Sequence, residues 1–163
     1  MTPIRFCLAA LATVAAFVTP AHAAQISAVT AVNVVKPVSL SKLQDLDFGT
    51  LTYSSFTGTR TIVLSRAGVI TCGADIVCSG VAKQARFNVQ GTNKLTVLLS
   101  YTGGALSNGT DSIPFVPNGP ASVVLTSSGV PGIDFDVGGT ITVAPTLIGG
   151  AYSGTLTVTA DYQ

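Results

Sequence analysis

Short runs rich in valine, threonine and isoleucine recur along residues 24–163, and glycine, proline or asparagine closes most of them. β-branched residues favour strands, whereas glycine, proline and asparagine favour turns. The expected strands are residues 26–35, 46–53, 60–65, 85–90, 95–101, 122–126, 140–143 and 151–162, with weaker candidates at 69–71 and 113–116. So many short strands in 140 residues predict one all-β domain, a β-sandwich or a barrel.

The residues between these runs predict turns and sheet edges. Asn108-Gly109 predicts a tight turn, and Gly138-Gly139 is expected to bend the chain in the same way. Pro114, Pro117, Pro120 and Pro131 cluster in one stretch. Because proline cannot donate to a β-ladder, that stretch is expected at a sheet edge or in a connection.

The first 23 residues have the pattern of a secretory signal peptide. Arg5 precedes an apolar run over residues 6–18, and Ala21-His22-Ala23 supplies a small-residue cleavage site. A membrane span needs about 20 residues, so this run is too short to be one. We therefore expect residues 1–23 to be removed on export. The remainder then has no membrane span, and passes through the periplasm to the cell surface or an extracellular fibre.

The remaining residues lack most catalytic chemistry. His22 is the only histidine, and residues 24–163 contain no glutamate and no tryptophan. Ser-His-Asp catalysis and an ordinary zinc site are therefore excluded. Lys and Arg balance Asp in this part of the chain, so no basic surface for nucleic acid is expected. Asp45 with Asp47, and Asp134 with Asp136, lack the further ligands that calcium requires. The sequence predicts a non-enzyme without cofactor or metal.

Two cysteines, Cys72 and Cys78, remain after signal removal. In an oxidising compartment they are expected to form one short-range disulfide. A free thiol pair or a metal site is the alternative.

Two terminal segments alternate in side-chain character. At the start, Ile26, Ala28, Thr30, Val32 and Val34 form one face of an expected strand, and the opposite face is also partly apolar. Such a strand must be covered, either by its own domain or by another subunit. At the end, an expected strand over residues 151–162 places Tyr152, Leu156, Val158 and Tyr162 on one buried face.

Several segments resemble a secreted bacterial family of unknown function. The run over residues 36–50, KPVSLSKLQDLDFGT, is similar to the opening signature of that family. Further similar segments are FNVQG at 87–91, VGGT at 137–140 and GAYSG at 150–154. The resemblance spans the chain beyond the signal peptide and implies no particular activity.

A looser resemblance links the chain to spore-coat-protein-U-like and archaic chaperone–usher pilins. Tyr162 is the penultimate residue and Gly150 the fourteenth from the end, as such subunits commonly have. The resemblance implies an immunoglobulin-like Greek-key β-sandwich that lacks one strand, which a chaperone and then a neighbouring subunit supply. It implies donor residues Ile26, Ala28, Thr30, Val32 and Val34, and a groove-edge strand with Gly150, Tyr152, Leu156, Val158 and Tyr162. Its partners would be other copies, a periplasmic chaperone and an outer-membrane usher.

The sequence thus supports two hypotheses. The first is a structural pilin-like subunit of a surface fibre, assembled by donor-strand exchange. The alternative is a self-contained secreted β-sandwich that acts as an adhesin or carbohydrate-binding module. In the alternative, Tyr53, Phe56, Tyr101 or Phe115 would stack on sugars.

Overall fold

The computed structural model describes residues 24–163, and the expected signal peptide, residues 1–23, lies outside the described residues. The chain divides into two units at Asn33, and the second unit is Val34–Gln163. No helix among residues 24–163 is long and apolar enough to cross a membrane.

The described part of the first unit, residues 24–33, forms no strand, although a strand was expected over residues 26–35. Ile26 is fully exposed, and Val29 and Val32 are 98% and 86% exposed. A strand needs a hydrogen-bonded neighbour, and no described segment of the same chain pairs with this one. It therefore presents apolar side chains without cover.

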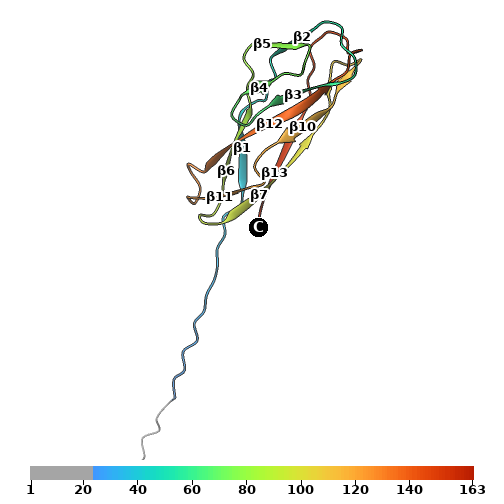
Figure 1. Cartoon of the computed structure of the whole chain (residues 1–163). Helices are drawn as coiled ribbons and strands as arrows, with labels where there is room; N and C mark the ends of the chain where they lie inside the picture. Colours follow the sequence, from blue (N-terminus) through green and yellow to red (C-terminus); the bar gives the residue numbers. More distant parts are fainter. Residues whose placement is uncertain (1–23) are drawn as a thin grey trace, which may run out of the picture. The chain divides into compact units, whose positions relative to one another are not determined.

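The second unit consists of antiparallel sheets (Figure 1). The largest has six strands, with β10 paired to β12 beside the path β1-β6-β12-β3-β4. Its strands are β1 (Ser39–Gln44), β3 (Arg60–Leu64), β4 (Ile70–Thr71), β6 (Ala85–Gln90), β10 (Phe115–Asn118) and β12 (Ile133–Val143).

A three-stranded sheet has the order β11-β7-β13, and two two-stranded sheets complete the fold. The three strands are β11 (Ser122–Val124), β7 (Thr96–Gly103) and β13 (Leu156–Tyr162). One of them pairs β2 (Thr50–Tyr53) with β5 (Ile76–Ser79), and the other is a hairpin of β8 (Leu106–Ser107) and β9 (Ser112–Ile113). The prediction of an all-β sandwich is confirmed.

The hydrophobic core consists of two clusters. The Phe115 cluster has as its buried members Phe48, Ile62, Leu64, Ile76, Ile113, Phe115, Ile141 and Val143. The Phe87 cluster has as its buried members Ala85, Phe87, Val89, Val97, Leu99, Leu125, Phe135 and Val137. Leu46 and Leu156 are half-buried and pack against both clusters.

The expected strand over residues 46–53 is interrupted. Asp47 makes an isolated bridge to Lys83, and β2 begins only at Thr50. Between them Gly49 has a φ of 73°, a conformation that L side chains rarely adopt. The Gly49 N–H donates to Asp47 Oδ1 at 2.8 Å, so the aspartate stabilises this local turn.

The expected bend at Gly138-Gly139 is wrong, because β12 runs through both glycines as a regular strand. β12 pairs with β6 over Ile133–Val137 and with β3 and β10 beyond it. A side chain at Gly138 would collide with the main chain at Leu64, and one at Gly139 with the Phe115 ring. These glycines permit close approach rather than a turn.

The expected C-terminal strand is shorter than residues 151–162. Only Leu156–Tyr162 pairs with β7, so Gly150 and Tyr152 lie in the preceding loop. That loop makes other hydrogen bonds, including a bridge between Ser107 and Ser153. Alternation of side chains alone does not reveal these competing partners.

The disulfide between Cys72 and Cys78 is confirmed, with the two Cα atoms 6.2 Å apart. Cys72 follows β4 and Cys78 lies in β5, so the bridge closes the connection between two short edge strands. Both cysteines pack against the Phe115 cluster as partly buried residues.

We predict that Gly138→Ala destabilises the domain by roughly 1–3 kcal/mol or more, because its methyl group has no space against the backbone at Leu64. Gly149→Ala is the matched control, since nothing lies within 4 Å of a Cβ there. Urea unfolding followed by circular dichroism measures both. Equal midpoints for the two variants would contradict this account of β12.

We also predict that reducing the disulfide lowers the free energy of unfolding by roughly 2–2.5 kcal/mol without unfolding the domain. A loop of this length constrains the unfolded chain only modestly. Unfolding curves of the oxidised protein and a Cys72→Ser, Cys78→Ser variant give the difference. A variant with no folded baseline would show that the bridge matters more than its loop length implies.

Candidate functional site

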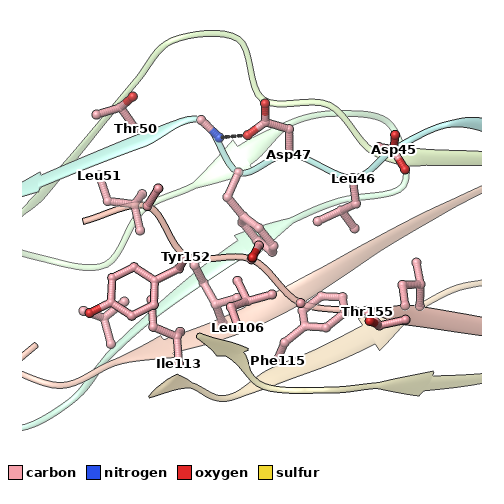
Figure 2. A pocket seen from close by; sticks show the side chains of 18 of the residues that line it. Asp45, Leu46, Asp47, Thr50, Leu51, Leu106, Ile113, Phe115, Tyr152 and Thr155 are labelled. Carbon is pink, nitrogen blue, oxygen red and sulfur yellow. Dashed lines mark hydrogen bonds between the residues drawn. The ribbon is translucent and has the colours of Figure 1, made fainter. Parts of the chain in front are cut away.

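A cleft of about 870 Å³ is lined by the end of β1, by the residues that follow it (45–51 and 53) and by the loop that leads into β13 (147–155) (Figure 2). Members of both core clusters line it, among them Phe87 and Ala85 of one cluster and Phe115 of the other. Leu46 and Leu156, which bridge the clusters, line it as well. The cleft therefore combines apolar core side chains with polar ones, among them Lys42, Asp45 and Asp47.

The loop before β13 lines the cleft, and hydrogen bonds hold this loop in place. The Tyr53 hydroxyl donates to the Leu147 carbonyl. The Ile148 N–H donates to the Asp111 carboxylate at 2.9 Å, and the Tyr152 hydroxyl donates to the Ile148 carbonyl at 2.6 Å. Burial raises the pKa of Tyr152, and nearby Asp111 and Tyr53 raise it further. Tyr152 therefore remains a neutral donor at physiological pH.

Two sheet edges beside this region are unpaired within the described residues. β1 pairs only with β6, and β13 pairs only with β7. Gly104 N donates to the Thr155 carbonyl, and Gln163 N donates to the Thr96 carbonyl. These two bonds show which residues of β13 direct their main-chain groups toward β7. By the antiparallel rule, odd-numbered residues of β13 bond to β7 and even-numbered ones direct N–H and C=O to the free edge. Leu156, Val158 and Ala160 thus have free main-chain groups.

The side chains of β13 follow the expected alternation. Leu156, Val158, Ala160 and Tyr162 are half-buried against the Phe87 cluster, whereas Thr157 and Thr159 are exposed. Gly150 and Tyr152, expected on the same strand, line the cleft from the preceding loop instead. The structure thus places three of the five expected groove-edge residues on β13 and two beside the cleft.

At the other end of β1 and β13 the two strands are tied together. The Tyr162 hydroxyl donates to the Lys36 carbonyl at 2.7 Å, and the Lys36 N–H donates to Thr92 Oγ1 at 2.7 Å. Tyr162 thus links the end of β13 to the segment that precedes β1. The hydroxyl of Tyr162 is a contact that the sequence pattern did not reveal.

The acidic pairs singled out in the sequence have structural partners. Asp45 pairs with Lys42 at 2.6 Å, and Asp136 with Arg86 at 2.9 Å. Asp134 accepts a hydrogen bond from the buried Asn88 amide at 2.6 Å. Among residues 24–163, no group of three or more His, Cys, Asp or Glu side chains is arranged to hold a metal ion.

The aromatic residues expected to stack on sugars serve packing instead. Phe115 is buried and lies edge-on to Phe48, with ring centroids 6.1 Å apart. Tyr53 and Phe56 pack edge-on at 5.4 Å, and the Arg60 guanidinium lies 5.2 Å from the Phe56 centroid. The Tyr101 hydroxyl donates to the Pro120 carbonyl at 2.7 Å, and burial raises the pKa of Tyr101 to about 12. Phe115 is thus buried, whereas Tyr53, Phe56 and Tyr101 are half-buried.

We predict that Leu156→Ala lowers the free energy of unfolding by about 2 kcal/mol, because Leu156 packs against both clusters. Thr157→Ala, an exposed neighbour on the same strand, should change it by less than about 0.5 kcal/mol. Urea titration of both variants checks the difference. A Leu156→Ala midpoint equal to that of Thr157→Ala would mean that Leu156 does not connect the clusters.

Comparison with known protein families gives a match over residues 38–162, to the family described as Domain of unknown function (DUF4402). No curated protein and no solved structure matches the chain. The matched stretch begins just before β1 and ends at Tyr162, so it includes every strand and the cleft. It agrees with the resemblance to a family of unknown function. The chain belongs to the DUF4402 family, a domain of unknown function.

Proposed function

We propose that this protein is a pilin-like structural subunit of a bacterial surface fibre, assembled by donor-strand exchange. The N-terminal segment of one copy would lie between β1 and β13 of the next. One observation carries the proposal: the same chain has a cleft that reaches its core and an apolar segment that stays exposed among the described residues. The segment of one copy could fill the cleft of another, and the cleft could then cover the apolar side chains of that segment.

The main chain supports the proposal first. A strand laid along β13 would bond to the free N–H and C=O groups of Leu156, Val158 and Ala160. Strand addition at a sheet edge is a recurring mode of recognition, in which main-chain hydrogen bonds give affinity and alternate side chains give specificity. The edge would then no longer be open to uncontrolled pairing.

The exposed apolar side chains of the N-terminal segment also support the proposal. Ile26, Val32 and Val34 share one face of the segment and are 100%, 86% and 79% exposed. Burying three such side chains is worth roughly 5–9 kcal/mol, before the loss of freedom on association is subtracted. Inserted between the clusters, they would join the Phe87 and Phe115 clusters, which Leu46 and Leu156 now bridge.

Export and assembly factors belong to the same proposal. Residues 1–23 have the signal-peptide pattern, so the subunit would pass through the periplasm before reaching the cell surface. An exposed apolar segment and an open cleft are aggregation hazards in transit. A periplasmic chaperone that covers the β13 edge, and an outer-membrane usher that replaces it with a neighbour, would meet this need.

The proposal predicts that deleting residues 24–35 abolishes fibres and that a peptide of residues 24–35 then binds the truncated protein in a one-to-one ratio. Fibres are scored by electron microscopy and peptide binding by isothermal titration calorimetry. The physical reason is that the peptide supplies the missing strand to a cleft that no other segment fills.

Two peptide variants provide the matched comparison. Ile26→Asp with Val32→Asp places charges on the inward face and should weaken binding at least about a hundredfold, because carboxylates would replace the apolar side chains that pack against the core residues of the cleft. Ser27→Asp with Asn33→Asp places the same charges on the opposite face and should have a much smaller effect. Fibres that persist after the deletion, or equal affinities for the two peptides, would refute the donor assignment.

A further inference from the structure

The sequence contains the pair Asn-Gly twice, at 108–109 and at 118–119, and the fold places the two pairs in different surroundings. Asn108-Gly109 lies in the turn between β8, which ends at Ser107, and β9, which begins at Ser112. Gly109 is exposed and has a φ of 93°, and a Cβ there would have no described atom within 4 Å. This pair can therefore change its conformation without breaking a strand.

The second pair, Asn118-Gly119, is held by its neighbours. Asn118 is the last residue of β10 and pairs with Gly138 of β12. A side chain at Gly119 would collide with the Tyr101 ring, and the Tyr101 hydroxyl donates to the Pro120 carbonyl at 2.7 Å. A rotation between Asn118 and Gly119 would therefore have to break the ladder or displace the tyrosine ring.

An asparagine followed by glycine can lose its side-chain amide group without an enzyme. The main-chain nitrogen of the glycine attacks Cγ of the asparagine and gives its proton to solvent base, and the new C–N bond closes a succinimide ring. The Cγ–Nδ2 bond breaks, and Nδ2 takes up a proton and leaves as ammonia. Glycine favours the attack because it has no Cβ to obstruct the close approach.

Water then opens the succinimide ring at either of its two carbonyl groups. Opening at Cγ gives aspartate, and opening at the main-chain carbonyl gives isoaspartate, in which the main chain continues through Cγ and is longer by one atom. Water is consumed and ammonia is released, so no oxidant or reductant takes part.

The hydrogen bonds around Asn108 favour the attack. Asn108 Oδ1 accepts from the Thr110 N–H at 2.9 Å and from the Asp111 N–H at 2.7 Å. These two donors would stabilise the negative charge that develops on Oδ1 while Cγ is attacked. The Gly109 N–H donates to Ser107 Oγ at 3.0 Å, so the attacking nitrogen already has a proton acceptor beside it.

We propose that Asn108 is a site of spontaneous deamidation and that its isoaspartate product loosens the wall of the cleft. The extra main-chain atom falls in the turn that sets the register of β8 and β9, in which Leu106 pairs with Ile113. Both of these side chains line the cleft. Asp111, in the same turn, accepts from the Ile148 N–H at 2.9 Å and so holds the loop before β13. The modification does not depend on the proposed function.

The first test compares the two asparagines in one folded protein, incubated at mildly alkaline and mildly acidic pH and analysed by peptide mapping with mass spectrometry. Asn108 should convert at least about tenfold faster than Asn118, because only Asn118 must first leave a ladder. Conversion should be faster at alkaline pH, since solvent base takes the proton of the attacking nitrogen. In urea with the disulfide reduced, neither pair is constrained and the two rates should be similar.

The second test measures the effect on the cleft wall. In the isoaspartate form, separated by ion-exchange chromatography, the Ile148 amide should exchange at least about tenfold faster than in fresh protein. The Thr157 amide, which bonds to β7, is the internal reference and should not change. Asn108→Asp is the matched variant, because it keeps the oxygen acceptor and a main chain of normal length, and its Ile148 amide should exchange as in fresh protein.

Equal conversion of Asn108 and Asn118 in the folded protein would overturn the assignment of the site, because the fold would then make no difference between the two pairs. An unchanged Ile148 amide in the isoaspartate form would overturn the effect on the cleft wall.

Discussion

The fold depends on one requirement of β-structure: the main-chain groups of a strand need hydrogen-bond partners on both sides or exposure to water. β13 has β7 on one side and no described strand on the other, although its side chains at Leu156, Val158 and Ala160 pack inward. Under the proposed function, this free edge is where a strand of another copy would pair. The cleft lies at the start of the same strand, where Leu156 lines it.

The hydrophobic core is divided into two clusters. Members of the Phe115 and Phe87 clusters meet at the cleft, and Leu46 and Leu156 contact both. An added strand would supply both the main-chain partners and the side chains between the clusters. The N-terminal segment has the matching chemistry, with exposed Ile26, Val32 and Val34 at alternate positions. The free edge of β13, the cleft and the N-terminal segment therefore all support the proposal that copies of the chain assemble.

The sequence predicts strands well where one face is continuously buried. Residues 85–90 coincide with β6, and 60–65 differ from β3 by one residue. β1 was missed because Ser39, Ser41 and Lys42 lack β-branched character, and pairing with β6 decides its conformation. Gly138 was misjudged because a glycine needed for close approach looks like a glycine needed for a turn. The cleft was beyond prediction in detail, since its walls come from segments far apart in the chain.

The central claim is that a strand from another copy pairs with the free edge of β13. Residue-resolved hydrogen exchange on dispersed and assembled protein tests it directly. The amides of Leu156, Val158 and Ala160 face the free edge, whereas those of Thr157, Thr159 and Asp161 already bond to β7 and serve as the internal reference. The account predicts that assembly slows exchange at the three even-numbered residues and leaves the odd-numbered ones nearly unchanged. Assembled protein in which Val158 and Ala160 exchange as fast as in the monomer would contradict it.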